Sequence, residues 1–117
     1  MPFIFVCIDR PNVNLIQFLK DLDRSFDVVI TSTNIAAVEL GAHIANNVNV
    51  SATLQTTDLN NRQTYETNGD VRLRIETFLE SIRSMSFQIA IVVSYAENYN
   101  NWAQYTIHNE DWGIGPM

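Results

Sequence analysis

The sequence predicts an α/β fold, in which a mostly parallel central sheet is covered by helices on both faces to give three layers. Short apolar runs rich in β-branched and aromatic residues occur at 3–8, 26–31 and 87–94, and such runs are typical of strands buried on both faces. Segments with helical periodicity lie between these runs. Strands that alternate with helices form βαβ units, whose strands are parallel.

Size and composition favour a single domain over residues 1–117. Hydrophobic residues make up 46% and charged residues 17% of the chain, which excludes a disordered tail or a coiled coil. The net charge of -6, with scattered basic residues, argues against nucleic acid or an anionic membrane as the main partner. The single cysteine, Cys7, excludes an internal disulfide and a cysteine-based zinc site, and no metal or cofactor is expected.

Localisation is predicted from the absence of targeting signals. No apolar run approaches the ~20 residues that span a bilayer. The first residues lead directly into a strand pattern without the basic region of a signal peptide. We therefore expect an intracellular, cytoplasmic protein.

The first half of the chain contains two predicted strand–helix pairs. The strand at 3–8 is followed by one face of an amphipathic helix, formed by Leu15, Phe18, Leu19 and Leu22. After the strand at 26–31, a second helix begins near Ser32 or Thr33, either of which could cap it, and ends at 46–47.

The second half opens with an alternating, more exposed strand at 48–54 and a polar loop at 55–69. Loops of this length in a small domain are usually functional or disordered. Apolar residues at helical spacing from Val71 to Ile82, with Asp70 placed to cap them, predict the clearest helix of the chain. The strand at 87–94 follows. The tail, about 97–117, contains a short helical candidate around residue 102 and a strand-like segment at 105–108.

The carboxyl ends of parallel strands are where ligands bind in open α/β sheets. The candidate functional residues therefore follow the predicted strands, and they are Cys7, Ile8, Asp9, Thr31, Ser32, Ser94 and Tyr95.

Three segments, in this order, resemble the histidine phosphatase (phosphoglycerate-mutase-like) superfamily, in particular its short single-domain members. FIFVCIDR is similar to the strand that leads into the family's Arg-His-Gly signature, and VVITSTNIAAVELGAHIA is similar to its strand, Ser-Ser-Pro turn and helix. NGDVRLRIETFLESI followed by IAIVVSYA is similar to its late helix and the strand ending in Val-Ser-His-Gly. The resemblance covers roughly residues 3–96 and implies a shortened fold of that type.

The resemblance also implies that the catalytic groups are missing. In the family, a histidine takes the phosphoryl group, two arginines and a second histidine hold the phosphate, and a carboxylate donates a proton. Here the first arginine is matched by Cys7, the nucleophilic histidine by Ile8 and the glycine by Asp9, while the second arginine is matched by Ala36 and the second histidine by Tyr95. The acidic residue falls near Asn60 or Asn61.

The implied protein is a pseudo-enzyme with no catalytic residues. Its vestigial pocket is expected to contain Cys7, Ile8, Asp9, Ser32, Ala36, Ser94 and Tyr95. Phosphoryl transfer needs a positioned nucleophile and fixed positive charge, and isoleucine offers no lone pair. The expected pocket is therefore filled by apolar or neutral polar side chains.

Two alternatives remain open at this point. The first is a hydrolase with a relocated site that uses His43 or His108 with carboxylates; it requires one of these histidines to lie in a cleft beside an acidic partner. The second is a small α/β regulatory binding module. Such modules cluster acidic residues at the end of the first strand and have a late lysine, whereas this chain has Asp9 alone and no lysine after Lys20.

The tail suggests how the chain could act without catalysis. Tyrosine and tryptophan are enriched at protein interfaces, and four of them lie in the last residues, namely Tyr99, Trp102, Tyr105 and Trp112. They could form an interface, or they could fold back over the edge of the sheet. We expect a protein-interaction or structural subunit that binds a protein partner or self-associates.

Overall fold

The structure is a computed structural model that describes residues 3–9, 14–85, 89–95 and 97–98. Its elements in chain order are β1 (Phe3–Cys7), α1 (Leu15–Asp21), β2 (Phe26–Thr31), α2 (Ile35–Asn47), β3 (Val50–Gln55), the 3-10 helix η1 (Thr57–Leu59), α3 (Asn68–Arg83) and β4 (Ala90–Ser94). The predicted alternation of strands and helices is confirmed. The predicted tail elements, His108 and the aromatic residues at 99, 102, 105 and 112 lie outside the described residues.

The four strands form one parallel sheet in the order β1-β4-β2-β3. β4 comes last in the sequence but lies between β1 and β2, so that Ile91 pairs with Ile4 on one side and with Val29 on the other. Every residue of β4 is buried. This central position explains why residues 89–93 form a continuous apolar run.

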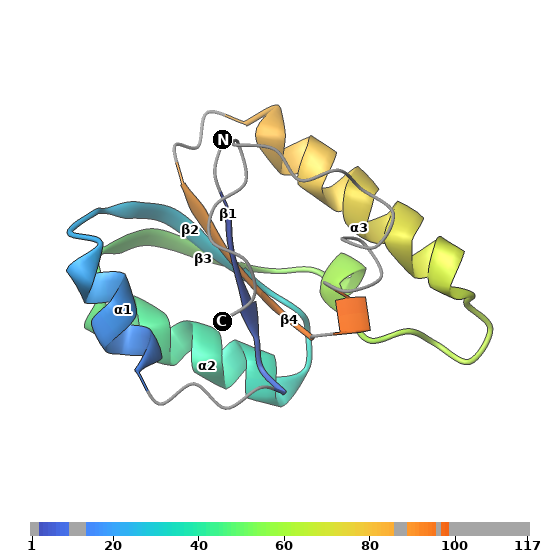
Figure 1. Cartoon of the computed structure of the whole chain (residues 1–117), viewed down its shortest axis with the longest axis horizontal. Coiled ribbons are helices and arrows are strands. Elements are labelled where there is room, and N and C mark those ends of the chain that lie inside the picture. The colour runs from blue at the N-terminus through green and yellow to red at the C-terminus, as the bar shows by residue number, and fades with distance from the viewer. Residues whose placement is uncertain (1–2, 10–13, 86–88, 96, 99–117) are drawn as a thin grey trace.

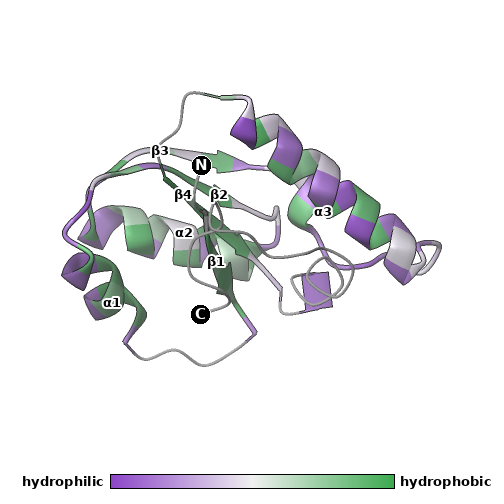
Figure 2. Ribbon diagram, turned by 45° about the horizontal axis from the view of Figure 1, so that its top comes forward, coloured by the Kyte–Doolittle hydropathy of each residue, from purple (hydrophilic) through white to green (hydrophobic). Residues whose placement is uncertain are grey.

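Helices cover both faces of the sheet, as predicted (Figure 1). On one face, α1 and α2 pack over Val29 and Ile91, and on the other, α3 packs over Val28 and Ile30. Successive residues of a strand point to opposite faces, which is why β2 needs apolar side chains at consecutive positions. Figure 2 shows α3 carrying hydrophobic and hydrophilic residues around its circumference, and its buried residues include Ile75.

The two best-defined helix starts differ from the predicted caps. α2 is capped by Asn34, whose side chain accepts a hydrogen bond from the Ala36 amide at 2.9 Å. Neither Ser32 nor Thr33 caps it, because the Ser32 amide still donates to the Val93 carbonyl of the sheet. Because residue 32 is still hydrogen-bonded to the sheet, the helix cannot begin there.

The start of α3 is a capping box built on Thr67. The Thr67 hydroxyl accepts from the Asp70 amide at 3.1 Å, and the Asp70 carboxylate accepts from the Thr67 amide at 2.9 Å. Asp70 is therefore the third helical residue and not the cap that the sequence predicts, and α3 begins before Val71.

The strand predicted at 48–54 is shifted along the chain. The Val48 amide donates to the Ile44 carbonyl at 3.0 Å, so Val48 still closes the carboxyl end of α2. β3 consequently begins at Val50. The predicted loop at 55–69 also contains η1 and the first residues of α3.

Candidate functional site

The carboxyl ends of three neighbouring strands meet at one edge of the sheet. The Ile8 amide donates to the Ser94 carbonyl at 2.8 Å, and the Ser32 amide donates to the Val93 carbonyl at 3.2 Å. The residues that follow β1, β4 and β2 are thereby placed side by side. This edge is where the fold is expected to bind a ligand.

The loop between β3 and α3 is held over this edge by Arg74. Its guanidinium donates to the carbonyl oxygens of Asp58 and Asn60, and to both carboxylate oxygens of Glu66 at 3.0 Å. These hydrogen bonds lower the pKa of the Glu66 carboxyl below its usual 4.5, the Arg74 side chain being the largest cause. One arginine fork thus gives the loop a fixed shape.

A buried polar cluster joins the same loop to the end of β4. The Ser94 hydroxyl donates to the Leu59 carbonyl at 2.6 Å. The Asn98 amide group donates to the carbonyls of Leu59 and Asn60, both at 3.0 Å. Ser94 and Asn98 are fully buried. The loop is therefore anchored at both α3 and β4.

Three buried oxygens near this edge have no hydrogen-bond partner among the described residues, namely Thr31 Oγ1, Ser32 Oγ and Asn98 Oδ1. Buried polar atoms without a partner are rare and cost roughly 1–3 kcal/mol each. Such atoms mark positions where water or a bound group can complete the hydrogen bonding.

A cleft of about 240 Å³ opens between the loop and the sheet edge, and it is lined by Thr33, Asn34, Asn60, Asn61, Gln63 and Tyr95. Asn60 ties its two sides together, because its side-chain oxygen accepts from the Thr33 amide at 2.9 Å and its amide group donates to the Thr33 hydroxyl at 3.0 Å. None of these six described residues carries a formal charge. They can hydrogen-bond a neutral polar group, but they supply no cation to an anion.

Of the residues predicted to form the vestigial pocket, Tyr95 lines this cleft. Ser32 and Ser94 are fully buried at the same edge. Asn60 and Asn61, which the resemblance matches to the region of an acidic residue, line the same cleft.

The remaining predicted residues lie away from the cleft lining. Cys7 belongs to the core under α3, while Ile8 packs against the core on the side of α1 and α2. Asp9 is exposed, and Ala36 is exposed in the first turn of α2. Of the predicted strand-end residues, the one after β4 lines the cleft, whereas those after β1 do not.

Two arginines that the sequence did not single out lie near the loop. Arg62 Nε is 3.5 Å from a carboxylate oxygen of Glu97, and its Nη1 donates to the Glu66 carbonyl at 3.1 Å. Arg74 is held by Glu66 as described. No sequence spacing signals these contacts, since Glu66 lies in the loop before α3 and the pairing depends on how that loop folds.

His43 does not have the surroundings that a relocated hydrolase requires. It is exposed on α2, and its Nδ1 lies 3.3 Å from the side-chain amide of Asn47. No carboxylate among the described residues is hydrogen-bonded to it. The described part of the chain also has no cluster of three or more His, Cys, Asp or Glu residues that could hold a metal ion. None of the helices described is long and apolar enough to cross a membrane.

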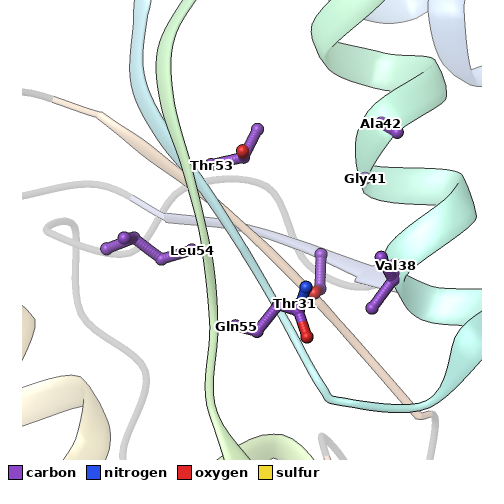
Figure 3. A pocket seen from close by; sticks show the side chains of 7 residues that line it. All are labelled: Thr31, Val38, Gly41, Ala42, Thr53, Leu54 and Gln55. Carbon is purple, nitrogen blue, oxygen red and sulfur yellow. The ribbon is translucent and has the colours of Figure 1, made fainter.

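A smaller hollow of about 110 Å³ lies between α2 and the β2–β3 side of the sheet (Figure 3). Its lining is Thr31, Val38, Gly41, Ala42, Thr53, Leu54 and Gln55. Its lining contains no titratable group, so it offers no acid or base that could activate the hydroxyls of Thr31 and Thr53.

Comparison with known proteins adds no relative: no protein-family model, no curated protein and no solved structure matches the chain. The function has to be argued from the residues of the site themselves.

Proposed function

We propose that the chain is a catalytically inactive histidine-phosphatase-like protein that acts as a protein-interaction or structural subunit. The observation that carries this proposal is the uncharged lining of the cleft at the carboxyl edge of the sheet. A phosphate-binding site needs fixed positive charge, because a phosphate monoester loses its hydration when it enters a cleft.

The chemistry of the matched positions supports the absence of catalysis. Ile8 stands where the resemblance places the nucleophile, and an aliphatic side chain cannot attack phosphorus. Ala36 and Tyr95 replace an arginine and a histidine. The nearest described cations do not compensate, because Arg62 is paired with Glu97 and Arg74 with Glu66.

The polar lining suits a binding role. Amide and hydroxyl side chains both donate and accept hydrogen bonds, and four amide side chains line the cleft, namely Asn34, Asn60, Asn61 and Gln63. Groups of this kind can pair with the backbone or the polar side chains of another protein. Interaction through a pre-shaped edge needs no catalytic group.

The test is an assay of the purified chain with p-nitrophenyl phosphate. We expect no hydrolysis above the buffer rate, and no rise of the melting temperature in inorganic phosphate compared with chloride at equal ionic strength. The proposal is falsified if the chain hydrolyses the ester and Tyr95→Phe or Asn60→Ala abolishes that activity. Arg24→Gln, which lies away from this edge, serves as the matched control and should leave both readouts unchanged.

A further inference from the structure

Among the described residues, β1 and β3 are the outer strands of the sheet, and they differ in how exposed their residues are. Residues 4–7 of β1 are buried, with exposed fractions of 1–3%. In β3, by contrast, residues 51–55 are exposed, and among the described residues β3 pairs only with β2. An open strand of this kind presents unpaired backbone groups to any strand that approaches it.

β3 also lacks the devices that usually prevent edge pairing. Natural edge strands carry lysine, proline or a bulge that blocks a second chain. Residues 48–57 contain no charged residue, no proline and no glycine. The register with β2 runs without a bulge from Val28↔Ala52 to Thr31↔Gln55. The exposed edge is therefore regular and neutral.

The hydrogen bonding to β2 fixes which backbone groups of β3 face outwards. The Phe26 amide donates to the Asn49 carbonyl at 2.8 Å, while Phe26 is in register with Val50. In a parallel ladder the amides and carbonyls of alternate residues point to opposite sides. Val50 and Ala52 thus direct their N–H and C=O groups away from β2. This alternation ends before Thr56, whose amide donates to the Thr31 carbonyl of β2 at 2.9 Å.

We propose that β3 pairs antiparallel with β3 of a second copy of this chain, about a two-fold axis at Ala52. This inference rests on the proposed function, in which the chain can self-associate, and identifies the strand through which two copies would pair. Ala52 then lies opposite Ala52 of the second copy, and Val50 lies opposite Leu54. The outward-facing Ala52 pair exchanges two backbone hydrogen bonds, and the two sheets become one.

The side chains of β3 are self-complementary in this register. Ala52 and Leu54 lie on the face of their β2 partners Val28 and Ile30, and Leu54 is 48% exposed in the single chain. Val50 packs against the core under α1 and α2, so the apolar contact across the axis on this face is made by Ala52 and Leu54. On the other face, Ser51 lies opposite Thr53 of the second copy, and hydroxyl pairs are favoured across antiparallel strands. Figure 3 shows Thr53 and Leu54 on opposite sides of β3.

The uncharged sequence of β3 lets a second copy approach at this strand. Two identical chains that each carry a net charge of -6 repel one another, and a two-fold axis places like side chains close together. The uncharged stretch at 48–57 is where two copies can meet without opposing carboxylates. A basic partner, by contrast, would find no acidic side chain on this strand.

The first test is the concentration dependence of association, measured by sedimentation velocity. We expect reversible dimers, and Ala52→Glu should raise the dimer dissociation constant at least tenfold because it places two carboxylates at the axis. Leu73→Glu adds the same charge at an exposed apolar site on α3 and should leave that constant unchanged. Circular dichroism should show the same fold for both variants, since both side chains are exposed.

The second test is crosslinking under mild oxidation by copper–phenanthroline. Ala52→Cys should form a disulfide-linked dimer, because the paired Cα atoms lie about 5.5 Å apart in this register. Gln55→Cys should not, since the two-fold axis separates its copies by several residues. The parent chain, whose Cys7 is buried, should not crosslink either.

Three outcomes would overturn the inference: a parent chain that is monomeric at all concentrations, a dimer that Ala52→Glu leaves intact, or crosslinking of Gln55→Cys in preference to Ala52→Cys. A dimer that instead dissociates in Trp102→Ala would assign self-association to the tail and leave the proposed function standing. Failure of the proposed function is seen separately, as hydrolysis of the phosphoester.

Discussion

Arg74 has the largest set of described side-chain hydrogen bonds around the candidate cleft. A guanidinium has five N–H donors in one plane, and here they reach Glu66 and the carbonyls of Asp58 and Asn60. The side chains of Arg74 and Glu66 are 19% and 12% exposed, so solvent screens their attraction less than it screens a surface pair. The shape of the cleft wall therefore depends on this ion pair as well as on the hydrogen bonds from Ser94 and Asn98.

This ion pair should make stability depend on pH. Because Arg74 lowers the pKa of Glu66 below 4.5 in the folded chain, the stabilisation is complete above pH 4.5 and is lost as the pH falls through the lower, folded pKa. Glu66→Gln should cost about 1–2 kcal/mol at pH 7 and progressively less in acid. Urea denaturation at several pH values measures this.

Glu80→Gln is the control for this experiment, because Glu80 also pairs with an arginine but its side chain is 70% exposed. Glu80→Gln should lower the free energy of unfolding by less than ~0.5 kcal/mol at every pH. A cost of Glu66→Gln that is the same at pH 7 and in acid would contradict the role given to the carboxylate.

At the scale of elements, the contact between α2 and β2 depends on Gly41. A Cβ atom added at this position would lie 2.5 Å from Thr31 Cγ2 and 3.4 Å from Val29 Cγ1. The first distance is shorter than any ordinary carbon–carbon contact. The helix can approach the sheet this closely because the residue facing Thr31 has no side chain.

Gly41→Ala should therefore destabilise the chain by about 1–3 kcal/mol, although alanine favours a helix interior by up to about 1 kcal/mol over glycine. Thr31→Ser removes only the methyl group that collides, so Gly41→Ala combined with Thr31→Ser should recover most of the loss. Thermal and urea unfolding of the four proteins in this cycle give the coupling. Additive effects of the two substitutions would show that the helix does not rest on this methyl group.

Elements with strong local patterns could be predicted from the sequence, and elements set by long-range contacts could not. Ile75 and its neighbours at helical spacing marked α3 because the pattern is local. The cap of α2 was misplaced because Ser32, Thr33 and Asn34 are all good caps, and only the sheet bond from Ser32 to Val93 decides among them. Those partners lie more than 60 positions apart in sequence.

The candidate site was predictable only in its location. Parallel strands place Ser32 and Tyr95 at the same edge, and this follows from the strand pattern alone. The amide-lined wall at Asn60, by contrast, depends on how Arg74 and Asn98 hold the loop. Neither contact produces a periodic pattern in the sequence, so the position of this cleft wall could not be predicted from the sequence.

At the scale of the whole molecule, two separate cores share one sheet. One core lies under α3 and includes Ile75, and the other lies under α1 and α2 and includes Leu19. β4, which forms after both helical layers have been synthesised, contributes Val92 to the first core and Ile91 to the second. Neither layer has a complete sheet to pack against until β4 is in place.

The two layers should therefore unfold together. Ile75→Ala leaves a cavity in the core under α3 and should cost about 2–5 kcal/mol, whereas Leu73→Ala, at an exposed site on the same helix, should cost under ~0.5 kcal/mol. Native-state hydrogen exchange measures which elements of the variant have less protected amides than in the parent chain. If β4 couples the layers, Ile75→Ala accelerates the slowest amides of α1 and α2 as much as those of α3. Acceleration confined to α3 would mean that this helix detaches alone, and that the sheet with α1 and α2 is the stable unit.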